Sequence, residues 1–353
     1  MIGAVLLLLV ESLRVGTVPS EDFAATLEKL RKTARIPGLS AVVVKDGRVV
    51  FKQGFGFANL EKRIRATPDT PYNIASVTKP ISAIVALKLV EEGRLDLDRL
   101  VKTNPRFSGF CEEFRQEKSI FARDLRCGEL TMRHLLSHSV SGAPGERFSY
   151  NPILYSWASR PMAAAAGKPF SALVEEYVFR PAGMKHSARI HRELPLRPDL
   201  ALALAPPYHV DDSGKVFPSP PLSQQGDGAA GGVISTALDL AKFDAALDTG
   251  KLVSARSRDL MMTPTRSTAG TTIPYGLGWY VQEFRGRKLV WHSGWWEKAY
   301  SALYLKVPEE KLTLILLANS EGLWWDNPLD QAQVERSPFA AAFLDRFSSP
   351  RGR

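Results

Sequence analysis

The stretch Asn73-Ile74-Ala75-Ser76-Val77-Thr78-Lys79-Pro80 leads directly into residues 81–90, and eight of these ten residues are apolar. A helix with so little polar surface has to be buried. Pro80 is compatible only with the first helical turn, where its missing N–H leaves no bond unmade. The pattern therefore predicts a central buried helix with Ser76 at its N-terminal end and Lys79 on the same face.

This placement suits nucleophilic catalysis. A serine hydroxyl is a weak nucleophile until a base removes its proton, and a lysine whose pKa is lowered by burial or by a neighbouring cation can be that base. The helix N-terminus favours the negative charge that develops in acyl transfer. A Ser-x-x-Lys pattern also arises by chance, so the alternative is a capped helix with a surface lysine, and the rest of the chain must decide.

Composition narrows the class of protein. The 353 residues are enough for one large domain or two, and 44% hydrophobic with 24% charged residues excludes disordered and fibrous proteins. The formal net charge is +9, but lysine and arginine are scattered, without a basic run or an aromatic-interleaved motif. We therefore expect no nucleic-acid partner and interpret the charge as favouring solubility, with a mild preference for anionic substrates.

The N-terminal region gives a weak indication of location. Residues 5–10 are apolar and end at Glu11, which is too short a run to span a bilayer, and no basic residue precedes them. They are either the end of a signal sequence or a helix that packs on the body. We expect a periplasmic or secreted protein ahead of a cytoplasmic one. Cys111 and Cys127 would then form a disulfide, although two unpaired thiols are equally compatible with the sequence.

Hydrophobic periodicity and turn residues predict the order of elements. The expected elements are a helix over 21–35, a hairpin of strands 39–44 and 49–55 around Asp46-Gly47, the buried helix after Ser76, mostly helix and loop over 95–136, helix over 152–184 interrupted at 167–169, an irregular crossing over 205–228, a helix from the capping-box pattern at 236–239 to about 247, strands 278–284, 288–292, 299–307 and 312–318, and a helix over 331–347.

This order predicts an α+β fold. An antiparallel sheet built from both ends of the chain is flanked by N- and C-terminal helices, and a mainly helical region is inserted between its two parts. The expected domains are a tail over 1–20, a sheet domain of 21–80 plus 229–353, and a helical domain of 81–228. The active site is expected in the cleft between the two domains.

Several ordered motifs resemble the serine β-lactamase and penicillin-binding-protein superfamily, especially its class C-like branch, which includes D-alanyl-D-alanine peptidases and family VIII carboxylesterases. The resemblance covers residues 23–347. Its landmarks are Gly54-Phe55-Gly56, Ser76-Val77-Thr78-Lys79, His134-Leu135-Leu136-Ser137-His138, Pro144-Gly145-Glu146-Arg147-Phe148-Ser149-Tyr150, Gly231-Gly232 and His292-Ser293-Gly294.

The resemblance implies roles for individual residues. Ser76 is similar to the family nucleophile, Lys79 to its activating partner and Tyr150 to the general acid/base of the second motif. His292 would stabilise the charge on the tyrosine or bind a substrate carboxylate. The N–H groups of Ser76 and Trp295 would form the oxyanion hole. Further candidate substrate-binding residues are Asn151, Ser293, Gly294 and Tyr208.

Two departures from the family pattern bear on the substrate. The second motif is usually Tyr-x-Asn, but here the chain reads Tyr150-Asn151-Pro152, and adjacent residues point in different directions. The missing amide commonly holds the side-chain carbonyl of a β-lactam, so its absence weakens a β-lactamase or peptidase interpretation. The segment from Ser141 to Gly145 is also short for the family, which implies an open cleft that suits small or varied esters.

Two other patterns compete for interpretation. Gly226-Asp227-Gly228-Ala229-Ala230-Gly231 matches the dinucleotide fingerprint, but no strand precedes it, so close backbone packing is the better interpretation. His134 and His138 are spaced as a metal pair on a helix, but no carboxylate or cysteine set completes the site, so helix-packing histidines are expected.

The sequence thus predicts a serine acyl hydrolase that forms a covalent acyl-enzyme and uses no metal or cofactor. The preferred substrate is a small carboxylic ester. The alternatives are β-lactam hydrolysis, D-alanyl-D-alanine cleavage, or a non-catalytic protein that binds peptidoglycan-like peptides or a protein partner. No stable membrane span is expected, and the oligomeric state is left open.

Overall fold

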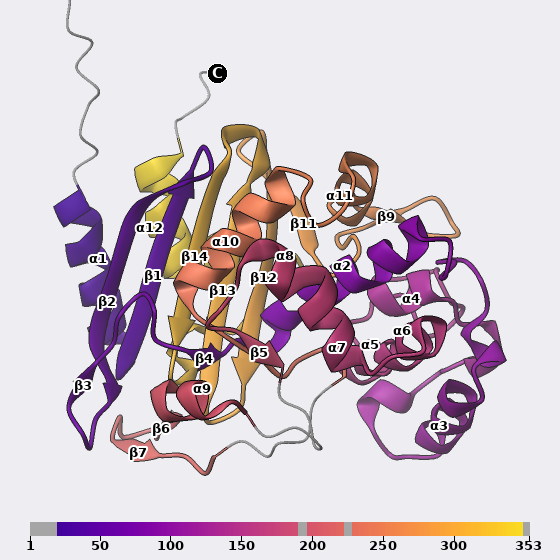
Figure 1. Cartoon of the computed structure of the whole chain (residues 1–353), viewed down its shortest axis with the longest axis horizontal. Helices are drawn as coiled ribbons and strands as arrows, with labels where there is room; N and C mark the ends of the chain where they lie inside the picture. The colour runs from indigo at the N-terminus through magenta and orange to yellow at the C-terminus, as the bar shows by residue number, and fades with distance from the viewer. Residues whose placement is uncertain (1–19, 190–195, 222–227, 349–353) are drawn as a thin grey trace, which may run out of the picture.

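A seven-stranded antiparallel sheet organises the chain (Figure 1), and a computed structural model describes residues 20–189, 196–221 and 228–348. The strand order is β11-β12-β13-β14-β1-β2-β3. The strands are β1 Gly38–Lys45, β2 Arg48–Asn59, β3 Ile64–Arg65, β11 Tyr280–Phe284, β12 Arg287–Trp296, β13 Tyr300–Val307 and β14 Leu312–Ala318. Strands from both ends of the chain share one sheet, so the predicted fold class is confirmed.

The junction between the two chain ends lies inside the sheet. β1 pairs with β14 along its whole described length, from Leu39 opposite Ala318 to Lys45 opposite Leu312. On its other side β1 forms the predicted hairpin with β2, and Asp46 and Gly47 at the turn both have positive φ, at 50° and 73°. A tight hairpin turn of this kind requires positive φ at both central residues, which explains the Asp-Gly pair.

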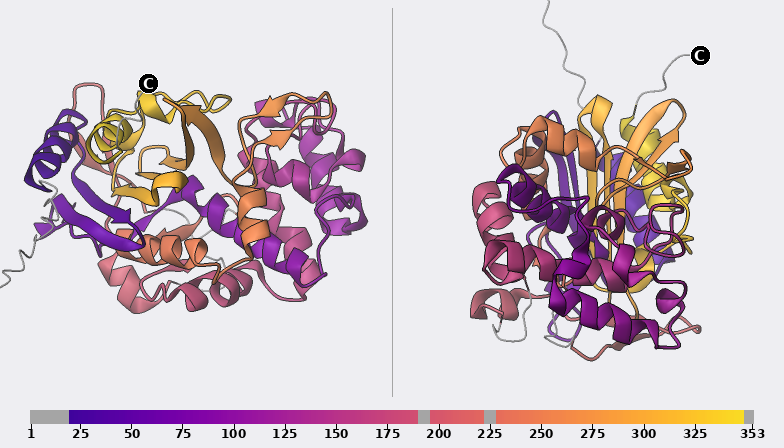
Figure 2. Two further views of the ribbon diagram at one scale, coloured as in Figure 1. Left: turned by 90° about the horizontal axis from the view of Figure 1, so that it is seen from above. Right: turned by 90° about the vertical axis from the view of Figure 1, so that its right-hand side faces the viewer.

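One face of the sheet is covered by the terminal helices α1 (Ser20–Thr33) and α12 (Pro338–Phe347), which lie side by side in Figure 2. Alternate residues of the central strands, such as Leu39 and Leu314, join Phe23 and Phe343 in this core. The last helix was predicted to begin at 331 but begins at Pro338. Ser337 caps it by accepting the Ala340 N–H, and proline is favoured in a first turn.

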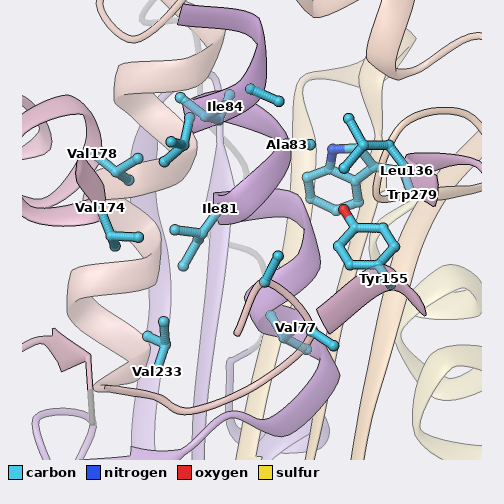
Figure 3. Close-up of a cluster of buried hydrophobic side chains, with 14 of the residues drawn as sticks. Val77, Ile81, Ala83, Ile84, Leu136, Tyr155, Val174, Val178, Val233 and Trp279 are labelled. Atoms are coloured by element: carbon cyan, nitrogen blue, oxygen red, sulfur yellow. The ribbon is translucent and has the colours of Figure 1, made fainter. Parts of the chain in front are cut away.

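The opposite face of the sheet packs on α2 (Thr78–Glu91) and α10 (Ala237–Asp248). A short 3₁₀ turn, η1 (Ala75–Val77), precedes α2. Figure 3 shows α2 in contact with apolar side chains from distant segments, with Val174 and Val178 on one side and Leu136, Tyr155 and Trp279 on the other. The prediction of a buried central helix after Ser76 is confirmed.

Shorter elements complete the chain. Around α2 lie α3 (Pro105–Arg115), α4 (Met132–Leu136), α5 (Pro152–Trp157), α6 (Ser159–Ala166), α7 (Phe170–Val174), the π-helical turn η5 (Glu175–Phe179) and α8 (Arg180–Ala182), with α9 (Pro198–Ala203) and α11 (Ala255–Met261) elsewhere. The minor strands are β4 (Tyr72–Asn73), β8 (Val233–Ser235) and β5 (Ala188–Arg189) in one sheet, and the pairs β6 (Tyr208–Val210) with β7 (Val216–Pro218) and β9 (Thr265–Arg266) with β10 (Thr272–Ile273).

Three details bear on the predictions. The helical segment breaks as expected at Gly167, which has a φ of 63°. The crossing predicted as irregular contains the hairpin β6–β7, which its proline-rich sequence concealed. The division into domains at residues 80 and 228 stays a prediction.

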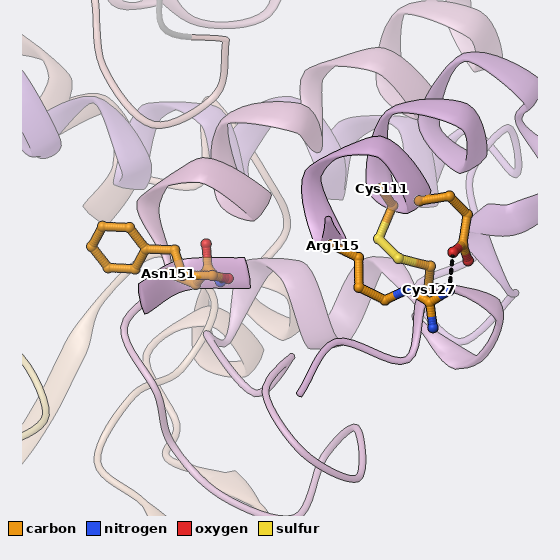
Figure 4. Close-up of a disulfide and its surroundings, with 6 residues drawn as sticks. Cys111, Arg115, Cys127 and Asn151 are labelled. Atoms are coloured by element: carbon orange, nitrogen blue, oxygen red, sulfur yellow. Dashed lines mark hydrogen bonds and ion pairs between the residues drawn. A yellow bond between two sulfur atoms is a disulfide. The ribbon is translucent and has the colours of Figure 1, made fainter. Parts of the chain in front are cut away.

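Cys111 and Cys127 form a disulfide that joins α3 to the turn 127–129 (Figure 4), which decides between the two alternatives for the thiols. Within the described residues, no helix has the length and apolar character needed to cross a bilayer. The apolar run at residues 5–10 lies outside the described residues.

Candidate active site

The turn that carries Ser76 is fixed from two sides. Ala75 has a φ of 46°, which is strained for a residue with a side chain, and the Asn73 side chain accepts the Ala75 N–H at 2.8 Å. On the other side lies Gly294 of β12, where a Cβ would come within 2.3 Å of the Ile74 carbonyl oxygen. The backbone before the serine is therefore held close against β12 by an Asx-type bond and by a position that only glycine fits.

Ser76 and Lys79 meet directly. Lys79 Nζ lies 2.7 Å from Ser76 Oγ and 3.3 Å from the carbonyl oxygen of Ala230, and the lysine side chain is fully buried. Its Nζ also lies 4.9 Å from the ring centroid of Tyr150 and 5.4 Å from that of Tyr155. The predicted spacing on one helical face thus places an amine within proton-transfer distance of the serine hydroxyl.

Tyr150 approaches the same oxygen from the other side. Its hydroxyl donates a hydrogen bond to Ser76 Oγ at 3.1 Å. Burial raises the pKa of the Tyr150 phenol well above its ordinary value, and the bond to Ser76 opposes this rise. The phenol is therefore neutral at neutral pH and has a proton to donate.

His292 lies beside Tyr150 without a hydrogen bond to it. The two ring centroids are 6.2 Å apart, His292 Nε2 bonds the Tyr275 hydroxyl at 2.9 Å, and Nδ1 donates to the Ser293 carbonyl at 2.6 Å. Because a carbonyl only accepts, Nδ1 carries the proton and Nε2 accepts from Tyr275. Burial, then the nearby Lys79, lowers the pKa of His292, so the ring is neutral. Both nitrogens have partners among the described residues, and the role of His292 stays a prediction.

The end of β12 forms one wall of the site. β11 pairs with β12 only from Arg287 to Trp291, so the edge of residues 292–296 is left facing η1. A cavity of about 180 Å³ opens between this edge and α5, and it contains the Ser76 side chain. Its lining residues are Ala75, Ser76, Pro152, Ile153, Ser156, Ala230, Gly231, Trp295 and Trp296. Ser293 is buried, and Gly294 contributes by its close approach to Ile74.

Two predicted substrate-binding residues have structural partners instead. Asn151 is buried; its Oδ1 accepts the Leu154 N–H at 3.0 Å and caps α5, while its Nδ2 donates to the Phe121 carbonyl at 2.8 Å. Tyr208 is also buried, and its hydroxyl accepts the Leu60 N–H and donates to Glu61. The structure brings neither side chain to Ser76, because each already satisfies its hydrogen bonds elsewhere.

The glycine-rich segment supports the site by its backbone. A Cβ at Gly228 would lie 2.1 Å from the Ser156 carbonyl oxygen, and the φ of Gly228 is 54°. This close packing brings Ala229 and Ala230 against α2, where Ser82 donates to the Ala229 carbonyl at 2.7 Å. Backbone packing, the interpretation preferred over a nucleotide site, is confirmed at Gly228; Gly226 and Asp227 lie outside the described residues.

Residues that the sequence did not single out for the site complete it. Tyr275 binds His292, Tyr155 donates to the Lys79 carbonyl at 2.9 Å, and the Ala230 carbonyl accepts from Lys79. No spacing rule links these positions. His134 and His138, which are spaced like a metal pair, bind separate partners. Nδ1 of His134 accepts the Thr131 N–H, and Nδ1 of His138 accepts the Asn151 N–H.

Comparison with known proteins agrees with this geometry. A family model with the description Beta-lactamase matches residues 23–335. Among curated proteins, the chain is similar to protein flp of Staphylococcus aureus strain MW2, with 27% identity over 332 residues. That match covers 87% of this chain, and the chain spans only 64% of the length of flp.

Solved structures show the same fold. The octameric penicillin-binding protein homologue from Pyrococcus abyssi superposes with a TM-score of 0.73 and 26% identity, over 92% of this chain and 77% of that chain. The class C beta lactamase from Rhodobacter sphaeroides gives a TM-score of 0.69 at 17% identity, over 94% and 100% of the two chains. The expected kinship with the β-lactamase and penicillin-binding-protein superfamily is confirmed, and the class C enzyme shares the fold.

Proposed function

Because the chain belongs to the Beta-lactamase family, whose members are generally serine hydrolases, we propose that it hydrolyses small carboxylic esters through an acyl-enzyme on Ser76. One observation carries the proposal. The oxygen of Ser76 lies within hydrogen-bond distance of both a buried amine, Lys79, and a neutral phenol, Tyr150. A base and an acid on one hydroxyl are what acyl transfer from a serine requires.

The roles follow from these contacts. Lys79 in its neutral form accepts the proton of Ser76 as Oγ attacks the ester carbonyl, and the oxyanion is stabilised by the N–H groups of Ser76 and Trp295. Tyr150 donates its proton to the departing alkoxide, which leaves as the alcohol, and the proton on Lys79 restores the phenol. Water then adds to the acyl-enzyme with the same groups in reverse, and the free acid is released.

The lining of the cavity supports an ester over a β-lactam or a D-alanyl peptide. Both alternative substrates carry a carboxylate near the scissile bond, but no lysine or arginine occurs among the described residues that line the cavity around Ser76. The side-chain amide of Asn151, the obvious partner for a β-lactam carbonyl, is already bonded at both ends. A small ester with apolar acyl and alcohol groups needs neither partner.

A fluorophosphonate probe tests whether Ser76 is a nucleophile. Intact-mass measurement should show one phosphonyl adduct on the wild type and on Ser213→Ala, a change at an exposed serine, and none on Ser76→Ala. Ser76→Ala should also reduce ester turnover by at least about 10³-fold. A folded wild type that forms no adduct would support the non-catalytic binding alternative instead.

The substrate class is tested by comparing a p-nitrophenyl ester of a short acid with a chromogenic cephalosporin and a D-alanyl-D-alanine peptide. The expected result is a kcat/KM for the ester at least ten times higher than that for either alternative. Efficient cephalosporin or peptide turnover with poor ester turnover would reverse this ranking.

A further inference from the structure

His138 is a fully buried histidine that the proposed mechanism does not use. It follows α4 and has a φ of 54°, which is the left-handed region that residues with side chains avoid. Strain of this kind persists only where surrounding contacts enforce it. Two hydrogen bonds and the nearest ring contact of His138 surround one residue, Tyr150.

His138 binds the chain on both sides of Tyr150. Its main-chain carbonyl accepts the Ser149 N–H at 2.8 Å, and its Nδ1 accepts the Asn151 N–H at 3.0 Å. One residue therefore binds the N–H groups of both chain neighbours of the phenol-bearing residue. The left-handed backbone at His138 is what allows its carbonyl and its ring to face the same short segment.

The imidazole also packs on the phenol itself. The ring centroids of His138 and Tyr150 are 4.2 Å apart with the planes tilted by 32°, and Tyr155 and Tyr275 contact the same imidazole at 5.0 and 4.9 Å. The ring of Tyr150 thus packs on the imidazole, and its hydroxyl binds Ser76. The imidazole is therefore one of the surfaces on which the phenol packs, and Tyr280 stacks on the same phenol ring.

The choice of histidine is not explained by packing alone. Because Nδ1 accepts a hydrogen bond, the proton of the neutral ring is on Nε2, and Nε2 is buried without a hydrogen-bond partner among the described residues. An unsatisfied buried donor costs about 1–3 kcal/mol. If the residue served only to fill space, leucine or phenylalanine would give a more stable protein, because neither buries an unpaired donor. Burial, then Lys79 and His292, lowers the pKa of His138, which keeps Nδ1 free to accept.

We propose that His138 is a positioning residue for Tyr150, fixing the backbone on both sides of the phenol through its carbonyl and its Nδ1 acceptor so that the phenol hydroxyl stays within reach of Ser76. This inference rests on the proposed function, in which Tyr150 is the general acid/base. The essential atom is the acceptor at the Nδ1 position. A misplacement of about 1 Å at a reacting group reduces rates about 10²-fold.

Two matched amide variants separate the two ring nitrogens. In His138→Asn the side-chain oxygen takes the place of Nδ1, and asparagine tolerates a left-handed backbone. In His138→Gln the longer amide takes the place of Nε2, and the acceptor for Asn151 is lost. For a p-nitrophenyl ester, we expect His138→Asn to keep kcat within about five-fold of wild type and His138→Gln to lose about 10²-fold in kcat with little change in KM. Equal losses in two variants of equal melting temperature would overturn the proposal.

A double-mutant cycle with Tyr150→Phe shows whether the effect passes through the phenol. If His138 acts by placing the hydroxyl, His138→Gln should cost less than about three-fold once that hydroxyl has been removed. Full additivity would refute the proposed role. Should His138→Gln fail to fold, His138→Leu, which also lacks the acceptor, replaces it in the cycle.

Crystal structures of the variants provide a readout that needs no activity. The distance from the Tyr150 hydroxyl to Ser76 Oγ should stay near the 3.1 Å of the wild type in His138→Asn and should lengthen in His138→Gln. An unchanged distance in His138→Gln would refute the positioning role even if the enzyme were active. A lengthened distance in a protein that forms no adduct with the fluorophosphonate would sustain the positioning role and refute the proposed hydrolase instead.

Discussion

The hydroxyl of Ser76 is shared between Lys79, in the next helical turn, and Tyr150, which lies 74 residues further along the chain. Among the described residues the phenol makes one hydrogen bond, to the serine, so its proton has a single destination there. Its neutral form is stabilised by burial. In the proposed mechanism, proton transfer to the leaving group therefore depends on the hydroxyl oxygen of Tyr150.

Tyr150→Phe removes that oxygen and leaves the ring. We expect kcat/KM for a short p-nitrophenyl ester to fall by about 10²–10⁴-fold, the usual loss when a general acid/base is removed. Tyr280→Phe is the matched control, because its ring stacks on Tyr150 but its hydroxyl donates to the Leu329 carbonyl away from Ser76. Steady-state kinetics of the two variants check this; equal activities would remove Tyr150 from the mechanism.

At this scale the sequence predicted part of the site. Helical spacing was enough to bring Lys79 to Ser76, because both lie in one short segment. Tyr150 required the family resemblance, since no periodicity connects residues so far apart. His292 and Asn151 were predicted to act directly, but each finds hydrogen-bond partners that only the folded chain reveals: Tyr275 for the histidine and Phe121 for the asparagine.

At the scale of elements, the site depends on how closely β12 approaches the turn η1. Gly294 makes this approach possible, because the place of its missing Cβ is already occupied by the Ile74 carbonyl, with the Ala302 side chain 3.1 Å away. A backbone contact between the unpaired end of β12 and the turn η1 thus holds both the serine turn and the N–H of Trp295.

Gly294→Ala should force the two elements apart. We expect a loss of about 1–3 kcal/mol in the free energy of unfolding from overpacking and a fall of at least ten-fold in kcat/KM, because Trp295 moves away from Ser76. Gly109→Ala in α3 is the control, since a Cβ there has open space, and it should stabilise the protein by about 0.5–1 kcal/mol. Urea unfolding and ester kinetics measure both effects; full activity in Gly294→Ala would contradict the role of this contact.

Element types followed from the sequence more closely than element ends. Short apolar runs predicted the strands that became β1 and β14, with the Asp46-Gly47 turn marking the hairpin, and the longer apolar run after Pro80 predicted α2. The start of α12 was placed seven residues early because residues 331–336 are mostly helix-favouring types such as glutamine, alanine, glutamate and arginine, whereas the cap at Ser337 decides where the helix begins. Pairs such as β6 with β7 have too few residues for a period to be read.

On the scale of the whole molecule, two neutral histidines are enclosed by the fold. Burial is the main cause that lowers the pKa of both His138 and His292 below the ordinary value of 6.5, and the nearby Lys79 is the next. The unfolded chain binds protons at these sites at a higher pH than the folded chain does. Stability is therefore fully present above about pH 6.5 and decreases as the pH falls below it.

This predicts a pH-dependent free energy of unfolding, with a maximum slope of about 1.4 kcal/mol per pH unit for each histidine in the window below pH 6.5. Urea unfolding between pH 5 and 8 measures the slope. His138→Asn should remove its share of the slope while retaining the backbone bond. A free energy that stays constant from pH 7 to pH 5 would show that the histidines are not held neutral.

The predicted architecture was confirmed at this scale because short apolar runs bounded by turn residues mark strands in both outer parts of the chain, and the segment between them lacks such runs. The sequence could not supply the strand order, because pairing partners such as β1 and β14 are selected by the collapsed chain and not by local pattern.

The pairing of β1 with β14 has a consequence for biosynthesis. Ala318, the partner of Leu39, is translated about 280 residues later, which at a ribosomal rate of about 5–20 residues per second is a wait on the order of 15 to 60 s. For that time the nascent hairpin β1–β2 carries an unpaired apolar edge. The yield of native protein in an expressing cell should therefore improve at a lower growth temperature or with extra chaperone. The sheet cannot be completed until β14 has left the ribosome.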